Sequence, residues 1–186
     1  MSIWRLGGTD STALPSASGD TRSAAEAIED AGGAARSGDF PISTKLLAVA
    51  QAELARAGGK PDEAVRTLRA TLDGSELYLA HVVLMDAYSA QGDNAAALAE
   101  ARWLADHRGR AYAEYSVLQT IPLNVAESNI AVLRSAELSL ALGRKDEARR
   151  SLDAFSKIWN DAAQPAAVAA EVRKLRTALP AGAPPA

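Results

Sequence analysis

The chain has 186 residues, of which 48% are hydrophobic, 23% charged and 5% aromatic, so it is long enough for one domain with a hydrophobic core. Its formal net charge is −3 and no basic stripe is visible, which argues against nucleic acid as a partner, because phosphate neutralisation supplies most of a nucleic-acid binder's affinity. Cysteine is absent, which excludes disulfides, thiolate metal sites and cysteine nucleophiles.

Both ends of the chain are predicted to be disordered tails. Residues 1–22 are rich in Ser, Thr, Gly and Asp, which is typical of a linker, and they suggest a tethered domain or a piece of a longer protein. Residues 180–186 contain only Pro, Ala and Gly. The chain shows neither the apolar stretch of a signal peptide nor one that could span a membrane. We therefore expect a cytoplasmic protein that does not insert into membranes.

Between the tails, residues 23–179 are predicted to form a domain of paired helices. A capping-box pattern at Ser23–Glu26 opens a short alanine-rich helix. The stretch 108–123 interrupts the pairs and is predicted to be an irregular insertion that can hold one short helix. The longer helices are predicted at 42–57 with 61–72, 76–91 with 94–107, 124–142 with 146–159, and 165–179 alone, the last beginning at Pro165.

Each predicted pair is joined at a glycine that is followed five residues later by an alanine. These turns are Gly59–Ala64, Gly92–Ala97 and Gly143–Ala148. Gly59 and Gly92 are 33 residues apart, close to one 34-residue period, and Gly92 and Gly143 are 51 apart, about one period plus 17 extra residues. Glycine can end a helix in the left-handed conformation, and the small alanine lets the two helices approach closely. The spacing therefore predicts helical hairpins that repeat.

This pattern resembles the tetratricopeptide repeat family over about residues 42–160. The middle unit matches best, at residues 84–93 (LMDAYSAQGD), where Leu84 and Tyr88 occupy the family's packing positions and Gly92 its turn. The other two units lack the family's aromatic residue in the first helix. They keep Ala52, Gly59, Ala64 and Leu68 in the first unit and Ala136, Gly143, Ala148, Leu152 and Phe155 in the third.

The resemblance implies an all-α, right-handed solenoid of about three tetratricopeptide-like hairpins with a C-terminal capping helix. The last predicted helix suits that role because one stripe of it is apolar and the rest is polar. The stripe consists of Val168, Val172, Leu175 and Leu179.

The sequence contains no recognisable catalytic or metal-binding motif. Neither His81 nor His107 has the spacing of a metal site. We expect His81 to lie in the core or at its boundary, and His107 to interact with the dipole at a helix end. Trp103 and Trp159 are expected to pack in the core. The chain is therefore predicted not to be an enzyme and to use no cofactor or metal.

An acidic residue lies six positions before each turn glycine: Glu53, Asp86 and Glu137. In the tetratricopeptide family this position faces the concave groove in which partners bind. The resemblance therefore implies a row of carboxylates, about 8–10 Å apart in adjacent units, that suits a basic segment. Alternatively, the row is a coincidence among the 23 acidic residues of the chain. Apolar residues expected on the same face are Val49, Leu79, Val82, Ile130 and Leu133.

The leading functional hypothesis is a non-catalytic protein-interaction or scaffold module that binds a partner peptide or helix in this groove. A weaker similarity links residues 78–81 (YLAH) and 107–114 (HRGRAYAE) to the C-terminal repeat region of bacterial multidomain regulators, cyclase-like proteins associated with peptide modification. That similarity implies the regulatory part of a larger protein. The alternative hypothesis is a small-ligand sensor in which the 108–123 insertion closes over a pocket.

Overall fold

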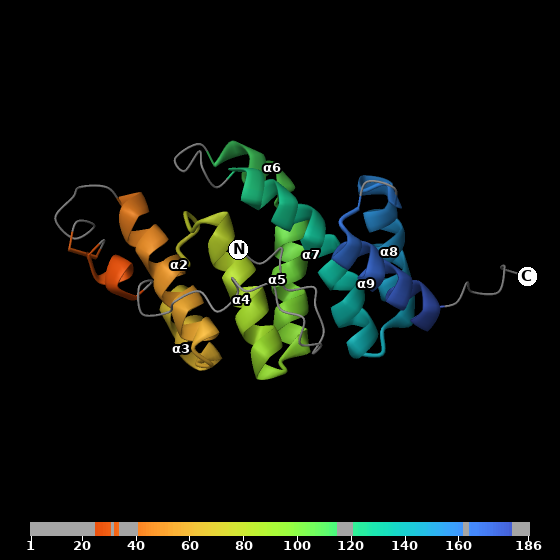
Figure 1. Ribbon diagram of the computed structural model, residues 1–186, viewed down its shortest axis with the longest axis horizontal. Helices are drawn as coiled ribbons and strands as arrows, with labels where there is room; N and C mark the ends of the chain where they lie inside the picture. The colour runs from red at the N-terminus through yellow and green to blue at the C-terminus, as the bar shows by residue number, and fades with distance from the viewer. Residues whose placement is uncertain (1–24, 31, 34–40, 115–120, 162–163, 180–186) are drawn as a thin grey trace, which may run out of the picture.

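The computed structural model describes residues 25–30, 32–33, 41–114, 121–161 and 164–179, and these residues form helices and turns without any strand (Figure 1). A short helical segment at 25–30 comes first. The helices that follow are α2 (Pro41–Ala57), α3 (Pro61–Arg69), α4 (Tyr78–Gln91), α5 (Asn94–Asp106), α6 (Arg108–Ala113), α7 (Ile121–Ala141), α8 (Lys145–Ile158) and α9 (Ala166–Ala178). The expected all-α class is confirmed over this part of the chain.

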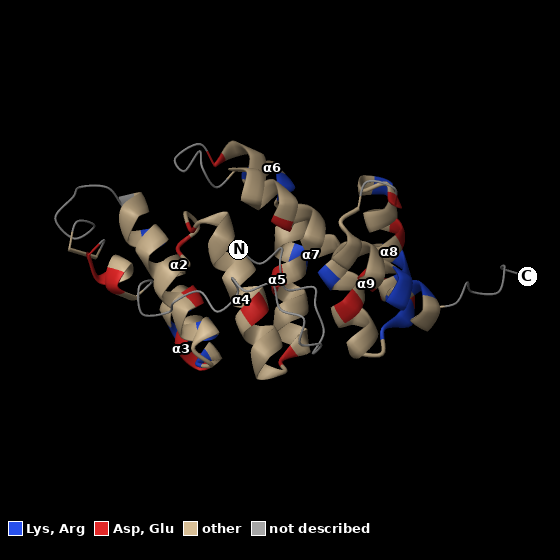
Figure 2. Ribbon diagram, viewed as in Figure 1, with Lys and Arg blue, Asp and Glu red and all other residues tan. Residues whose placement is uncertain are grey.

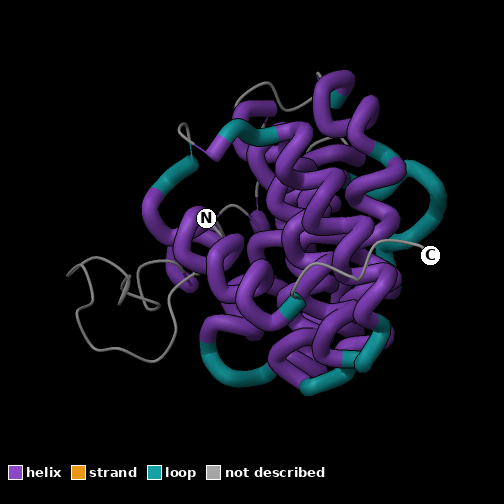
Figure 3. Tube along the Cα trace, turned by 90° about the vertical axis from the view of Figure 1, so that its right-hand side faces the viewer, coloured by secondary structure: helices purple, strands orange, loops and turns teal. Residues whose placement is uncertain are grey.

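The helices pack as successive hairpins. Helix α2 packs on α3, α4 on α5, and α7 on α8, while α3 contacts α4 and α5 contacts α7 to join one hairpin to the next. The first helices of the hairpins also touch in order, α2 with α4, α4 with α7, and α7 with α9. Figure 1 shows the hairpins following one another along the long axis of the molecule, and Figure 3 looks along that axis, with loops at the ends of the helices. One side of the molecule is therefore formed by α2, α4, α7 and α9.

The three glycine turns have the predicted geometry. Gly59, Gly92 and Gly143 have φ angles of 77°, 77° and 74°, the left-handed conformation that side-chain-bearing residues avoid. In the middle turn the Asp93 amide donates to the Tyr88 carbonyl across 3.0 Å, and the Asp93 side chain accepts a hydrogen bond from the Ala96 amide at the start of α5. The chain therefore reverses within a few residues and pairs the two helices.

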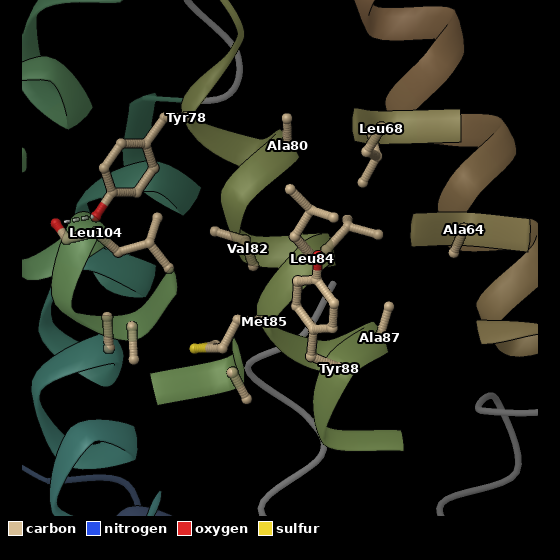
Figure 4. Close-up of a cluster of buried hydrophobic side chains, with 14 of the residues drawn as sticks. Ala64, Leu68, Tyr78, Ala80, Val82, Leu84, Met85, Ala87, Tyr88 and Leu104 are labelled. Atoms are coloured by element: carbon tan, nitrogen blue, oxygen red, sulfur yellow. Dashed lines mark hydrogen bonds between the residues drawn. The ribbon is translucent and has the colours of Figure 1, made fainter. Parts of the chain in front are cut away.

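The core has two parts. In the first, side chains of α3, α4, α5 and α7 surround fully buried Tyr78 and Leu84, and the Tyr78 hydroxyl donates to the Leu104 carbonyl across 2.7 Å (Figure 4). In the second, Phe155 is fully buried among residues of α7, α8 and α9. The predicted apolar stripe is buried there as expected, namely Val168, Val172 and Leu175 of α9 and Leu179 just after its end. Helix α9 thus covers the end of the last hairpin.

The insertion differs most from its predicted structure. Helix α6 occupies its first part, as the sequence allowed, but α7 begins at Ile121, so residues 121–123 are helical and not irregular. Pro122 fits because the first turn of a helix needs no backbone N–H donor. Helix α3 ends at Arg69, three residues before the predicted end. The capping-box residue Ser23 and the predicted tails 1–22 and 180–186 lie outside the described residues.

No helix among the described ranges is long and apolar enough to cross a lipid bilayer.

Candidate functional site

The three acids of the predicted row lie on adjacent helices. Glu53 is on α2, Asp86 on α4 and Glu137 on α7, and Figure 2 shows acidic segments at similar heights on these helices. We call this side of the molecule the first-helix face. It is defined by charged residues of α2, α4, α7 and α9 that pair or interact electrostatically, namely Glu53, Arg56, Asp86, Arg134, Glu137, Glu171 and Lys174.

Glu53 is paired on its own helix. Both of its carboxylate oxygens accept hydrogen bonds from Arg56, at 2.7 Å from Nε and 2.6 Å from Nη2. The Arg56 side chain is only 7% exposed, whereas that of Glu53 is 34% exposed. The carboxylate of Glu53 therefore neutralises a guanidinium that is largely removed from water, and its replacement by a cation would leave two positive charges together.

Arg134 links α4, α7 and α9 electrostatically. Its Nη1 donates to Glu137 across 2.6 Å, and one helix away Lys174 donates to Glu171 across 3.0 Å. Burial lowers the pKa of Arg134, but the carboxylates of Glu137, Asp86 and Glu171 outweigh that effect and raise it. Asp86 and Glu137 therefore both act on the Arg134 guanidinium, an environment that the sequence did not predict.

The Glu137 carboxylate is largely enclosed, with a side chain only 15% exposed. Burial raises its pKa, an effect that Glu171 reinforces and that Arg134 and Lys174 reduce but do not cancel. The predicted row is therefore a network of paired charges rather than a uniformly negative strip. The cations that pair with these acids were not predicted from the sequence. Arg56 and Arg134 nevertheless lie three residues from Glu53 and Glu137, a spacing at which side chains on a helix contact each other.

Three of the five predicted apolar face residues are not on the surface. Val82, Ile130 and Leu133 are at most 5% exposed and lie in the two parts of the core. The expectation for these three is wrong because α4 and α7 lie between neighbouring helices and bury more than one stripe. Val49 and Leu79 are partly buried against the first part of the core. These two can still offer apolar surface to a partner.

A second polar cluster surrounds His81 on α4. The ring is buried, with Nδ1 2.6 Å from a Glu100 oxygen and Nε2 3.5 Å from a Glu76 oxygen. It also stacks on Trp103, with 3.4 Å between ring centroids and 16° between planes. The prediction of a buried His81 is confirmed. Its partners were not predicted, because only the turn at Gly92 brings residues 100 and 103 opposite residue 81.

The described part of the insertion is fastened to the core. Glu114, which follows α6, accepts hydrogen bonds from the Tyr78 amide across 3.0 Å and from Asn124 Nδ2 across 2.9 Å. Arg108 donates to Asn129 of α7 across 2.6 Å. Residues 115–120 lie outside the described part of the chain. The segment 108–114 therefore acts as a structural attachment between α4 and α7.

Within the described residues, no group of three or more His, Cys, Asp or Glu side chains could hold a metal ion. One hollow of about 240 Å³ lies between α5, α7 and α8, lined by residues that include Arg102, Val132 and Arg150. Residues 108–114 do not line it. No family model matches the chain, and neither does any curated protein or solved structure.

Proposed function

We propose that this chain is a non-catalytic protein-interaction module, a right-handed solenoid of tetratricopeptide-like hairpins, and that it binds a peptide segment or helix of a partner on the first-helix face. The left-handed turns at Gly59, Gly92 and Gly143 and the hairpin order support this architecture. In such an array the first helices form one continuous surface that can bind an elongated ligand.

The observation that carries the proposal is the charge network that spans this surface. Four helices contribute four carboxylates and three cations to it, and they touch in the order α2, α4, α7, α9. Charges that are fixed across a surface favour a partner with the complementary arrangement, which gives specificity to the bound segment.

The partner proposed here is a segment with basic and apolar side chains. The carboxylates outnumber the cations on the first-helix face, and Val49 and Leu79 supply partly buried apolar surface beside them. Such a partner segment could belong to another protein or to the same polypeptide, if the chain is the regulatory part of a larger one.

The test begins with peptides selected from a random library on the purified chain. Their affinity is then measured by fluorescence anisotropy for the triple variant Glu53→Gln, Asp86→Asn and Glu137→Gln. Neutral amides are used because cations at these positions would repel Arg56 and Arg134. We expect affinity to fall by about tenfold or more, which corresponds to about 1.4 kcal/mol.

The matched control is the triple variant Glu63→Gln, Asp106→Asn and Asp153→Asn. These acids are exposed and lie on the second helices α3, α5 and α8. Their replacement changes the net charge by the same amount and should change affinity by no more than about twofold. Equal losses in both sets, or no loss in the first-helix set, would contradict the proposed binding face. Circular dichroism of each variant verifies that the helices are retained.

A further inference from the structure

Positive charge is concentrated near the C-terminal end of the molecule. Residues 144–186 contain eight Lys and Arg against five Asp and Glu, whereas residues 1–143 contain twelve against eighteen. Figure 2 shows basic positions gathered on α8 and α9, and acidic positions on the first helical segment at the opposite end of the long axis. The described ends of the molecule therefore differ in the sign of their charge, a distribution that bears on association rather than on fold.

The basic residues of α8 line a hollow at the surface. It has a volume of about 540 Å³ and lies at the turn into α8, and it shares Glu147 and Arg150 with the hollow of about 240 Å³ between α5, α7 and α8. We call the two together the α8 hollow. Its lining includes apolar Ala105, Val132 and Ala154 and three acids, and its five cations are Arg102, Arg144, Lys145, Arg149 and Arg150. Cations therefore predominate around a lining that is partly apolar.

Lys145 and Arg150 are the cations of this hollow that are open to a partner. The other three are paired with its acids, in the pairs Arg102–Glu147, Arg144–Glu147 and Arg149–Asp146. Within the described ranges, neither Lys145 nor Arg150 forms an ion pair, and both residues are exposed. A carboxylate of another molecule can therefore approach these two charges without breaking an internal pair.

An acidic segment of suitable composition lies at the other end of the same chain. Residues 26–30, which we call the acidic segment, have the sequence EAIED, with Glu29 and Asp30 exposed and Ile28 half-buried. Figure 1 places this segment at the α2 end of the molecule, far from α8 along the long axis. It therefore does not reach the hollow of its own chain in this arrangement, but the hollow of a second copy is open to it.

We propose that copies of this chain associate end to end, with the acidic segment of one copy bound in the α8 hollow of the next. Glu29 and Asp30 pair with Lys145 and Arg150, and Ile28 contacts the apolar part of the hollow. Complementary charges orient two surfaces and favour one pairing over others. Because the two surfaces differ, each pair of copies keeps one free surface of each kind, and longer assemblies form as the concentration rises. The first-helix face takes no part, so this inference is independent of the proposed function.

Sedimentation velocity of the full chain, over concentrations from micromolar to near millimolar, tests this association. At about 0.05 M salt we expect the weight-average sedimentation coefficient to rise with concentration, and at about 0.5 M salt to rise far less, because exposed charges are screened. A chain that stays monomeric at the lower salt concentration would overturn the proposal. So would an association that does not depend on salt.

Charge reversal then locates the contact. The variant Glu29→Lys with Asp30→Lys and the variant Lys145→Glu with Arg150→Glu should each stay monomeric, because each then presents two surfaces of like sign. The variant with all four changes keeps the wild-type net charge and restores opposite signs, so it should associate again.

The matched control is Asp62→Lys with Glu63→Lys on α3, two adjacent exposed acids outside both surfaces. It changes the net charge as the acidic-segment variant does, and it should associate as the wild type does. Equal loss in this control, continued association of either reversal variant, or no recovery in the fourfold variant would overturn the pairing. Circular dichroism of each variant verifies that the helices are retained.

Discussion

At the scale of single residues, Glu137 shows how a surface position becomes part of the structure. Its carboxylate is enclosed by Arg134 of its own helix and by Glu171 and Lys174 of α9, and burial raises its pKa. The sequence predicted where this acid would lie, because the turn at Gly143 fixes its register. It did not predict the enclosure, since that depends on α9, which follows some thirty residues later in the chain.

The raised pKa of Glu137 predicts a pH dependence of stability. An acid whose pKa is higher in the folded chain than in the unfolded chain binds its proton more tightly when folded. The folded chain therefore loses stability relative to the unfolded chain as the pH rises through that pKa. A Glu137→Gln variant cannot ionise and lacks this loss.

Urea unfolding at about pH 4 and about pH 7 measures the effect, on either side of the range in which buried carboxyl groups titrate. The free energy of unfolding of Glu137→Gln relative to wild type should be higher at the neutral value than at the acidic one. The opposite change would mean that the ion pair with Arg134 lowers the pKa of Glu137 by more than burial raises it. The exposed Asp153→Asn serves as the control and should show little difference between the two conditions.

At the scale of helices and turns, the sequence predicted most of what the structure shows. The turns at Gly59, Gly92 and Gly143 and the alanines that follow them depend on local backbone geometry, which is encoded within a few residues. Helix ends that are not marked by a turn glycine were less predictable. The start of α7 at Ile121 is one case, because Pro122 can either break a helix or stand in its first turn.

The left-handed turn of the α4–α5 hairpin gives a sharp stability prediction. A Cβ at Gly92 would meet no atom within 4 Å, so the cost of Gly92→Ala is conformational and should be about 1 kcal/mol of unfolding free energy. The matched control is Gly109→Ala inside α6, where the added Cβ also meets nothing within 4 Å. That change should stabilise the chain by about 0.5–1 kcal/mol, since alanine is the better helix former.

Chemical denaturation of both variants tests these two predictions, a loss of stability for Gly92→Ala and a gain for Gly109→Ala. A destabilisation of both would mean that α6 does not tolerate the added methyl group. A neutral Gly92→Ala would mean that the turn does not need its left-handed residue, and the basis of the repeat pattern would then be lost.

At the scale of the whole molecule, contacts between hairpins decide which residues are available to a partner. Val82, Ile130 and Leu133 were expected on the binding face, but packing between neighbouring helices buries them. The cluster around His81 forms only when α5 folds back on α4. Neither result follows from periodicity, because the period specifies which residues share a helix side and not how many sides of that helix are covered.

The remaining charged surface of α2, α4, α7 and α9 carries the proposed function, and its use by a partner can be mapped without altering the chain. Amide proton–nitrogen NMR spectra are recorded while a selected peptide is added to the isotope-labelled protein. We predict that the shifted signals cluster on these four first helices, around Glu53, Asp86, Arg134 and Lys174. Shifts confined to α3, α5 and α8, or to the 108–114 segment, would contradict the proposed binding face.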